Sequence, residues 1–471
     1  MGFSMNKLQG DATAKLSAYT KNLKYDDIPP EVSERAKMIN MHAIAAALAS
    51  APTEVSRRVI ELGKQMNGGA GGEATLWIDG SKVSMANAAF VNGTLTDMLD
   101  WEDCAWTGHP SAGVIPCAWA AAEAQHKSGK ELIEAIVAGY EVYTRVAMAV
   151  QPPKGWDYFK GWGLTTWQIF ACTTPAAKLL DLSEDQINQA FGISAVCNPI
   201  PSVLHHATMS DGYHYEHGFR AKDGIMAAMV ARSGLENFME ALDDPYAYEY
   251  HLTPDPHPEW YTKELGEKYY IMTTLCKHFP ANMWVQTPLE ITYNLVIRNG
   301  LKPEDIKEIV IDPPTQGRMT ISENGYDSIT QAQFSVPFAL ASVICDPNPG
   351  PQWYSPEKLK DRRVLDIAKK VRGGTGRPHQ LEESFGLFKA GSHPMKTITI
   401  TTNDGRVFSE SMDCHPGHPS NMMTREEFSD RFRLQAGFAG FSANKIERAV
   451  EMLCNLEQVS DVAEYSDILH R

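Results

Sequence analysis

The chain has 471 residues, which at roughly 150 residues per domain predicts about three folding units, or two if one of them is a large helical array. Hydrophobic residues make up 43% of the chain and charged residues 21%, so extensive disorder is excluded. With 43 Lys and Arg against 58 Asp and Glu, the formal net charge is −15, which disfavours nucleic acid and anionic membranes as partners.

The eight cysteines are scattered singly, without a Cys-x-x-Cys pair, which is typical of buried thiols in a reducing compartment. Cys414, His415 and His418 come closest to a ligand cluster, but no second half-site accompanies them, so a loop is favoured over a metal site. No apolar run approaches the ~18 residues of a spanning helix, and the N-terminus has no signal-peptide hydrophobic region. We therefore expect a cytoplasmic protein without a membrane partner.

The first part of the chain, up to about residue 273, carries the signals of helices. Two prolines at positions 29 and 30 open a long segment, since proline is tolerated in the first turn of a helix. Ser128 and Glu131 form a capping box ahead of a segment whose apolar residues recur every three or four positions. An alanine-rich stretch over residues 221–233 predicts a further helix. A compact all-helical domain follows from these signals.

The pattern changes after residue 273. Residues 308–312 predict a short strand, and residues 396–402 and 406–410 predict two strands of a hairpin, because an Asp-Gly turn signal joins them. Helical patterns lie between these strands, over residues 334–345 and 356–372. This part of the chain is therefore expected to form a smaller α+β domain.

The last segment is helical again. Thr424 can cap a helix together with Glu427, and the helical pattern continues to residue 469, so these helices are expected to rejoin the first domain. We predict a mainly α protein with two domains. Residues 1–273 and 417–471 form a large all-helical domain, and residues 274–416 form a smaller α+β lid domain inserted before the C-terminal helices.

The densest polar group of the sequence consists of Asp97, Asp100, Glu102, Asp103 and His109. Acids close to a histidine can hold its ring in one tautomer and raise its basicity, which favours a group that transfers protons near neutral pH. A solvated helix end explains the acids equally well. Asp100, Asp103 and His109 could also ligate a metal, although the second motif of a magnesium-dependent cyclase is not found, so this alternative is less favoured.

A second polar group begins at Lys277 and His278 and extends to Gln286. It lies at the predicted junction of the two domains, where clefts commonly form, so Lys277 would bring a cation to that cleft. The alternative is that Lys277 is an ordinary surface lysine.

A third group is rich in imidazole and cations, and it precedes or opens the alanine-rich helix. Histidines of a loop explain it at least as well as a ligand site. Its members are His205, His206, His214, His217, Arg220 and Lys222.

The chain resembles the MmgE/PrpD family, which contains 2-methylcitrate dehydratases, cis-aconitate decarboxylases and iminodisuccinate epimerases. The matching segments follow one another along nearly the whole chain. They are residues 88–93 (AAFVNG), 99–103 (LDWED), 108–111 (GHPS), 139–142 (GYEV), 178–180 (KLL), 279–281 (FPA) with Gln286-Thr287, and 334–339 (FSVPFA).

The resemblance implies a helical domain with a smaller α+β lid, a homodimer, and an active site between the domains that uses no cofactor and no metal. The substrate would be a small polycarboxylate. Residues 279–290 (FPANMWVQTPLE) are most similar to the 2-methylcitrate dehydratase branch, whereas the decarboxylase branch usually carries a histidine near Trp284.

Carried over by position, the resemblance implies three catalytic residues: Asp100, the histidine of the His-Pro-Ser motif at His109, and Lys277. It also implies that Cys104 stands where many members have threonine. The residues expected to bind substrate are Asp103, Cys104, Tyr213, His217, Arg220 and Gln286.

The sequence departs from the family pattern at three positions. Asp97 and Gly163 stand where relatives have histidine, and Tyr213 lies about where several members place a second active-site lysine. Two or three imidazole or ammonium groups are therefore missing, and the histidines of the third polar group are candidates to replace them.

The expected reaction is a hydro-lyase reaction of the 2-methylcitrate dehydratase type. His109, oriented by Asp100 or Asp103, would transfer the proton next to a carboxylate, and Lys277, helped by Arg220 or Lys222, would hold a substrate carboxylate. The alternatives are a cis-aconitate-type decarboxylase, an epimerase or isomerase of a dicarboxylic acid, a metal-dependent lyase, and a family member that only binds a ligand.

Overall fold

The computed structural model describes residues 10–69, 71–105, 108–150, 165–197, 209–235, 238–243, 248–253, 255–380, 383–384, 386–387 and 390–471. Its described part is mainly helical, as the sequence predicts, and contains a four-stranded sheet and two short two-stranded pairings. Within that part, no helix is both long enough and apolar enough to cross a membrane.

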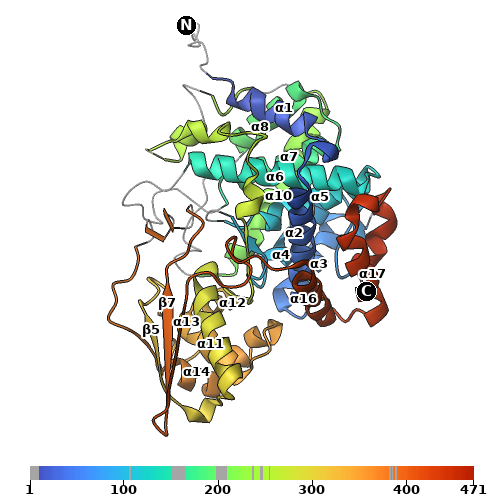
Figure 1. Ribbon diagram of the computed structural model, residues 1–471. Coiled ribbons are helices and arrows are strands. Elements are labelled where there is room, and N and C mark those ends of the chain that lie inside the picture. Colours follow the sequence, from blue (N-terminus) through green and yellow to red (C-terminus); the bar gives the residue numbers. More distant parts are fainter. Residues whose placement is uncertain are drawn as a thin grey trace.

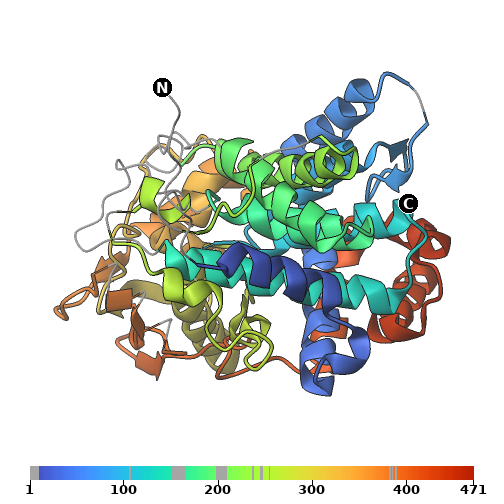
Figure 2. The ribbon, with the colours of Figure 1, turned by 90° about the horizontal axis from the view of Figure 1, so that it is seen from above.

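The upper part of Figure 1 is built from helices, and we call it the helical region. The N-terminal helices are α1 (Ala12–Asn22), α2 (Pro30–Ala49), α3 (Glu54–Met66), α4 (Met85–Asp97), α5 (Ser111–Ala124), α6 (Gly129–Ala149), α7 (Gln168–Leu179), α8 (Glu184–Cys197) and α10 (Gly212–Arg232). Figure 2, the view from above, shows α1 in dark blue lying over α6 in teal. The predicted helix starts are confirmed, because Pro30 occupies the first turn of α2 and Ser128 and Glu131 form the capping box of α6.

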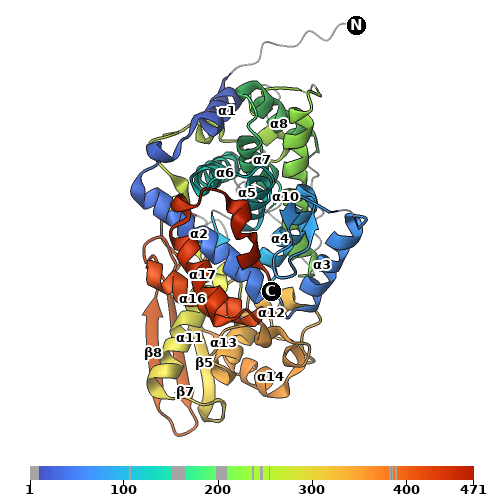
Figure 3. The ribbon, with the colours of Figure 1, turned by 90° about the vertical axis from the view of Figure 1, so that its right-hand side faces the viewer.

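The C-terminal helices α16 (Arg425–Phe438) and α17 (Ala443–Cys454) return to this region and pack against α2 (Figure 3). Thr424 and Glu427 form the predicted capping box at the start of α16. The hydrophobic core of the helical region accordingly combines buried residues of α1 to α8 and α10 with others between Met423 and Leu469.

Close helix packing brings α4 next to α10. A Cβ atom at Gly93 of α4 would lie 3.2 Å from the Cα atom of Gly218 in α10, and one at Gly218 would lie 2.4 Å from the carbonyl oxygen of Phe90. Because only glycine fits at both positions, the backbones approach closely and the end of α4 faces the first turns of α10. The polar residues of both helices meet there.

The lower part of Figure 1 is the sheet region, from α11 (Gln286–Asn299) to β8 (Val407–Met412). Its sheet has the order β6-β5-β7-β8, with β5 parallel to β6 and antiparallel to β7. The remaining elements are β5 (Ile306–Asp312), α12 (Ile329–Gln333), α13 (Val336–Cys345), α14 (Arg362–Ala368), β6 (Val371–Gly373) and β7 (Lys396–Thr402). The predicted hairpin is confirmed by β7 and β8.

Burial alternates along β7, whose isoleucines pack in a second hydrophobic core with α11 and α13. Four residues of the helical region also belong to this core, so the two cores meet near residue 100. They are Ala46, Ala49, Leu99 and Trp101. The domain boundaries at residues 274 and 417 stay a prediction.

One predicted helix is wrong. Residues 356–372 form a 3₁₀ turn, the short helix α14 and the strand β6. Asp361 ends the turn and caps α14 by accepting a hydrogen bond from the Arg363 amide. Val371 then pairs with Ile309 of β5, so sheet formation overrides the local helical pattern.

Candidate active site

Two antiparallel two-residue strands bring the first two polar groups together. In β3 (Asp103–Cys104), Asp103 pairs with Cys276 of β4 (Leu275–Cys276), and the next amide, that of Lys277, donates to the carbonyl oxygen of Glu102 at 2.9 Å. Asp100 adopts a left-handed backbone conformation, with φ of 51°, which turns the chain between α4 and β3. As a result, residues more than 170 positions apart face each other.

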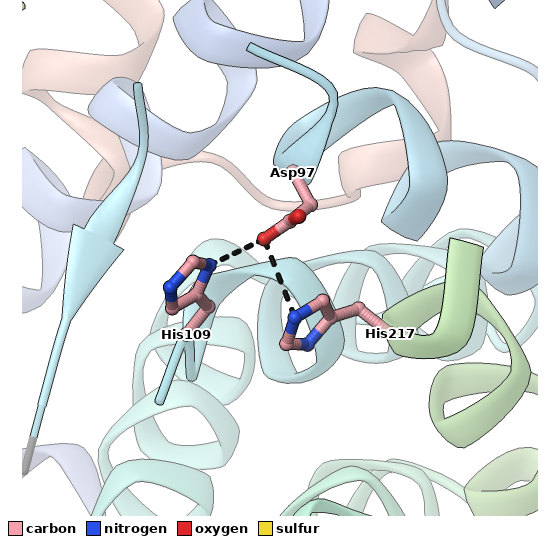
Figure 4. Close-up of side chains that lie close together, drawn as sticks. All are labelled: Asp97, His109 and His217. Carbon is pink, nitrogen blue, oxygen red and sulfur yellow. Dashed lines mark hydrogen bonds and ion pairs between the residues drawn. The ribbon is translucent and has the colours of Figure 1, made fainter. Parts of the chain in front are cut away.

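His109 is the centre of the cluster. Its ring atom Nδ1 lies 2.5 Å from Asp97 Oδ1 and 2.8 Å from Glu102 Oε1, and its Nε2 lies 3.0 Å from the Tyr213 hydroxyl. The His217 ring stacks on it with 5.1 Å between ring centroids, and Figure 4 shows Asp97 between the two imidazoles. All five side chains are buried. We call these residues, together with Asp100 and Lys277, the acid–histidine cluster.

The expectation that Asp100 or Asp103 orients His109 is wrong. Asp100 Oδ1 lies 3.9 Å from Nε2, beyond hydrogen-bond distance. Asp103 accepts hydrogen bonds from the Tyr140 hydroxyl and from the Ser111 amide, so it fixes the start of α5. Asp97 and Glu102 hold the ring instead.

Lys277 lies inside the protein rather than on its surface. Its Nζ atom forms ion pairs with Asp100 Oδ1 and Glu102 Oε1, and its side chain is fully buried. Lys277 is therefore paired with two carboxyl groups inside the protein, and its expected contact with a substrate carboxylate stays a prediction.

His214 and His217 lie in the first turns of α10, not in a loop before it. His214 Nδ1 lies 2.7 Å from Asp97 Oδ2, so this histidine holds the second oxygen of that carboxylate. Its Nε2 lies 3.1 Å from the hydroxyl of Thr330, which belongs to α12 in the sheet region. His214 and His217 therefore bring two imidazoles to Asp97, and their replacement of the family's missing groups stays a prediction.

Gln168 fixes the tautomer of His217. Its Nε2 atom donates to the carbonyl oxygen of His109 at 2.8 Å, so its Oε1 atom accepts from His217 Nδ1 at 2.7 Å. His217 then carries its proton on Nδ1 and presents an unprotonated Nε2 to Asp97 Oδ1, 3.5 Å away. No sequence motif singled out Gln168 or Thr330, since they lie in other helices and meet the cluster only in three dimensions.

The electrostatic environment keeps His109 protonated. Burial and the charge of Lys277 lower its pKa, but the carboxylates of Asp97 and Glu102 outweigh both effects and raise the pKa to about 10. For His217, burial outweighs the carboxylate of Asp97 and lowers the pKa to about 4, so this ring is neutral. The cluster thus holds one imidazolium stacked on one neutral imidazole.

The carboxyl groups divide as well. Burial raises the pKa of Asp97, but the surrounding imidazoles, with hydrogen bonds from His109 and His214, outweigh burial and lower it well below its usual value. Burial raises the pKa of Glu102 more than Lys277 lowers it. Asp97, which contacts three imidazoles, is therefore the more acidic of these two carboxyl groups.

Three other predicted site residues have structural contacts instead. Gln286 accepts from the amides of His278 and Phe279 and donates to two carbonyl oxygens, so it shapes the loop after Lys277. Cys104 Sγ lies 3.1 Å from Met283 Sδ, and burial raises the pKa of its thiol. Arg220 contacts Asp223 at 3.5 Å, one turn further along α10. Gly163, His205 and His206 lie outside the described residues.

Two sets of side chains in the described part of the chain have ligand atoms within 4.8 Å of one another and could hold a metal ion. One consists of Asp97, His109 and His217, and the other of Asp100, Glu102 and His109. The ammonium group of Lys277 contacts both carboxylates of the second set, so a metal there would have to displace that cation. The first set is the better candidate.

This arrangement can therefore deliver a proton from the buried imidazolium of His109, whose Nε2 atom meets the phenol of Tyr213.

Comparison with known proteins agrees with a site of this kind. The chain is 24% identical over 503 aligned residues to cis-aconitate decarboxylase of Aspergillus terreus. That alignment covers 99% of this chain and 98% of the relative. It is also 24% identical over 482 aligned residues to cis-aconitate decarboxylase of Homo sapiens, in an alignment that covers 97% of this chain and 94% of that protein. These relatives support the decarboxylase alternative better than the dehydratase hypothesis, which stays unconfirmed.

Two family models match the chain, the first over most of the N-terminal helices and the second over the sheet region and the C-terminal helices. The MmgE/PrpD N-terminal domain matches residues 14–260, and the MmgE/PrpD C-terminal domain matches residues 279–456. Together they cover most of the sequence, and the first alone covers more than half of it. The chain therefore belongs to the MmgE/PrpD family.

Proposed function

We propose that this protein is a lyase that decarboxylates a small unsaturated polycarboxylate of the cis-aconitate type. The observation that carries the proposal is the placement of His109, whose Nδ1 meets Asp97 and Glu102 and whose Nε2 meets the Tyr213 hydroxyl, an environment that raises the pKa of its ring. The two whole-length relatives named cis-aconitate decarboxylase support the substrate class.

The chemistry of such a reaction requires a proton donor. In a β,γ-unsaturated acid, the electron pair of the breaking bond to the carboxylate forms a new double bond between the α and β carbons. The former π pair takes up a proton at the γ carbon, and carbon dioxide leaves. An acid positioned at that carbon lowers the barrier, and such groups contribute typically 10²–10⁴-fold. His109 is that acid, through Nε2 directly or through the Tyr213 hydroxyl.

The same residues support a dehydratase less well. Proton removal next to a carboxylate needs a base that is free at the start of the reaction. A His109 pKa of about 10 leaves the ring protonated at neutral pH. The neutral His217 is stacked behind it, with Nδ1 bonded to Gln168.

The test is turnover of cis-aconitate by the purified protein in deuterium oxide. We expect release of carbon dioxide and a product that carries one deuterium at the former γ carbon, detected by NMR spectroscopy. His109→Gln should abolish both signals. Release of water from 2-methylcitrate without carbon dioxide would instead identify a dehydratase, and deuterium exchange without net reaction would identify an epimerase.

The assembly is proposed from the resemblance, and the location from the scattered cysteines and the lack of a signal-peptide region in the sequence. We propose a homodimer in the cytoplasm, with the small polycarboxylate as the ligand and no cofactor. Sedimentation equilibrium measures the assembly directly, and a monomer at micromolar concentration would contradict it.

A further inference from the structure

A cavity of about 200 Å³ lies in the sheet region, outside the acid–histidine cluster. Its wall includes the start of α11, the segment after β5 and the segment before β7. This volume has room for several water molecules or for one small organic molecule. None of the described residues that line it is Asp or Glu, although the chain as a whole has a net charge of −15.

Lys396 and Arg318 bring two cations to this wall. Lys396 is buried, and its Nζ atom donates to the carbonyl oxygens of Pro313 and Pro314 at 2.9 and 3.4 Å. Burial lowers the pKa of Lys396 to about 8, against the opposing effect of Asp312. Over the described ranges, Lys396 forms no ion pair with a carboxylate within 4.0 Å.

Arg318 is half-buried. Its guanidinium group lies 4.7 Å from the centroid of the Phe334 ring and donates to the carbonyl oxygen of Gly317 at 3.2 Å. In the part of the chain that the structure describes, it has no carboxylate partner either. Among the described residues, the direct contacts of these two cations are therefore with carbonyl oxygens and an aromatic face.

Buried polar atoms of the wall without a hydrogen-bond partner among the described residues include Thr315 Oγ1, Arg318 Nε and His379 Nδ1. The first two are donors, and His379 Nδ1 is a donor in one tautomer and in the protonated ring. Buried donors of this kind cost free energy unless an acceptor meets them, so the wall is complementary to oxygen atoms of an anion.

The cavity lies close to the acid–histidine cluster. Phe334, beneath the Arg318 guanidinium, packs edge-on against Tyr213 with 5.2 Å between ring centroids. On another side, Trp284 of the wall follows Met283, which contacts Cys104. The Phe334 ring thus contacts both the Arg318 guanidinium and the ring of Tyr213, whose hydroxyl meets His109.

We propose that this cavity binds a small polycarboxylate anion through Arg318 and Lys396, with Thr315 and His379 as additional donors. Two cations on separate segments match two separate carboxylates, and the apolar walls of Trp284 and Pro394 match the carbon skeleton between them. The anion is either the reacting molecule itself or a second polycarboxylate. The inference does not depend on the proposed activity, because it concerns binding alone.

The test is isothermal titration calorimetry with tricarballylate, a saturated tricarboxylate that has no double bond to protonate, at constant ionic strength. We expect Arg318→Gln and Lys396→Met each to raise Kd at least tenfold. Lys307→Met is the matched control, because Lys307 is an exposed lysine of β5 that does not line the cavity. It should leave Kd unchanged, and Lys396→Arg should restore most of the affinity.

Binding by both cavity variants as tight as in the wild type would overturn the proposal, and so would tighter binding of inorganic phosphate than of tricarballylate. Loss of binding in His109→Gln alone would also overturn it, because the anion would then lie in the cluster. Thermal unfolding checks that each variant is folded. If Lys396→Met does not fold, Arg318→Gln alone still tests the proposal.

Competition identifies the source of the anion. Displacement of tricarballylate by cis-aconitate at a stoichiometry of one supports the reacting molecule, and simultaneous binding of two molecules supports a second anion. Since tricarballylate binding is measured without turnover, an inactive protein that still binds it would contradict the proposed activity and leave the cavity proposal supported.

Discussion

The acid–histidine cluster and the cavity of the sheet region differ in whether their buried cations are paired with carboxylates. In the cluster, the cation of Lys277 is matched by Asp100 and Glu102, and the imidazolium of His109 by Asp97. In the cavity, Lys396 and Arg318 meet carbonyl oxygens and an aromatic ring. A compensated cluster holds a proton firmly in place, whereas uncompensated cations attract an external anion. The comparison therefore separates proton transfer from anion recognition.

The largest expected effect comes from removing the proton donor. His109→Gln should lower kcat for cis-aconitate by roughly 10²–10⁴-fold, the usual contribution of a positioned acid. The measurement is the initial rate of carbon dioxide release. The matched control is His126→Gln, because His126 also contacts a carboxylate, Asp461 at 2.8 Å, but lies exposed on the surface. Full turnover by His109→Gln would remove His109 from the mechanism.

The two buried lysines should respond differently to loss of charge. Lys277→Met leaves Asp100 and Glu102 buried without their cation, which should lower the free energy of unfolding by about 3–5 kcal/mol. Lys396→Met removes a charge without an ion-pair partner, so the loss should be much smaller. Equilibrium unfolding in urea measures both. Equal losses would contradict the contrast between the cluster and the cavity.

Asp97→Asn tests the cause of the raised His109 pKa. Because the protonated ring is the donor, the rate should be constant below the folded-state pKa and fall as pH rises through about 10. Without the Asp97 carboxylate, that alkaline limb should move to lower pH, so the variant should lose more activity at pH 9 than at pH 6. The measurement is kcat/KM as a function of pH.

Asp461→Asn serves as the control for that profile, since it alters the carboxylate that contacts the exposed His126.

The free energy of unfolding should depend on pH in the same direction as the rate. A pKa raised from 6.5 stabilises the fold fully below pH 6.5, and this contribution disappears as pH rises through about 10. An unchanged alkaline limb in Asp97→Asn would mean that another group sets it.

The smallest expected effect belongs to Tyr213→Phe. This change removes one hydrogen bond to His109 Nε2 but keeps the ring that packs against Phe334 and His217. One such bond contributes about 0.5–1.5 kcal/mol, so kcat should fall by about tenfold or less if Tyr213 only orients the ring. A much larger fall would show that the proton passes through the hydroxyl.

Much of the fold could be predicted because its signals are local. The capping boxes at Ser128 and Thr424 and the hairpin of β7 and β8 involve residues a few positions apart. The segment of α14 was predicted wrongly because its last part pairs with β5, more than 60 residues away. Local patterns fail where a distant strand supplies the hydrogen bonds.

The candidate site was predicted only in part. His109 and Lys277 were recognised from short motifs, and the structure brings both into one cluster. Spacing in the sequence could not decide which acid faces the histidine, since that depends on the turn at Asp100 and on the direction of each side chain. Asp97, which the sequence placed in the densest polar group but not among the expected catalytic residues, contacts His109, His214 and His217.

The sequence by itself determined the mainly helical fold class, the hairpin of the sheet region and the family, because these rest on periodicity, capping and ordered motifs. Only the tertiary structure decided the protonation state of His109, the pairing of Lys277 and the cavity of Arg318 and Lys396. These properties depend on burial and on charges contributed by distant segments, and a pKa or an ion pair is set by neighbours in space rather than in the chain.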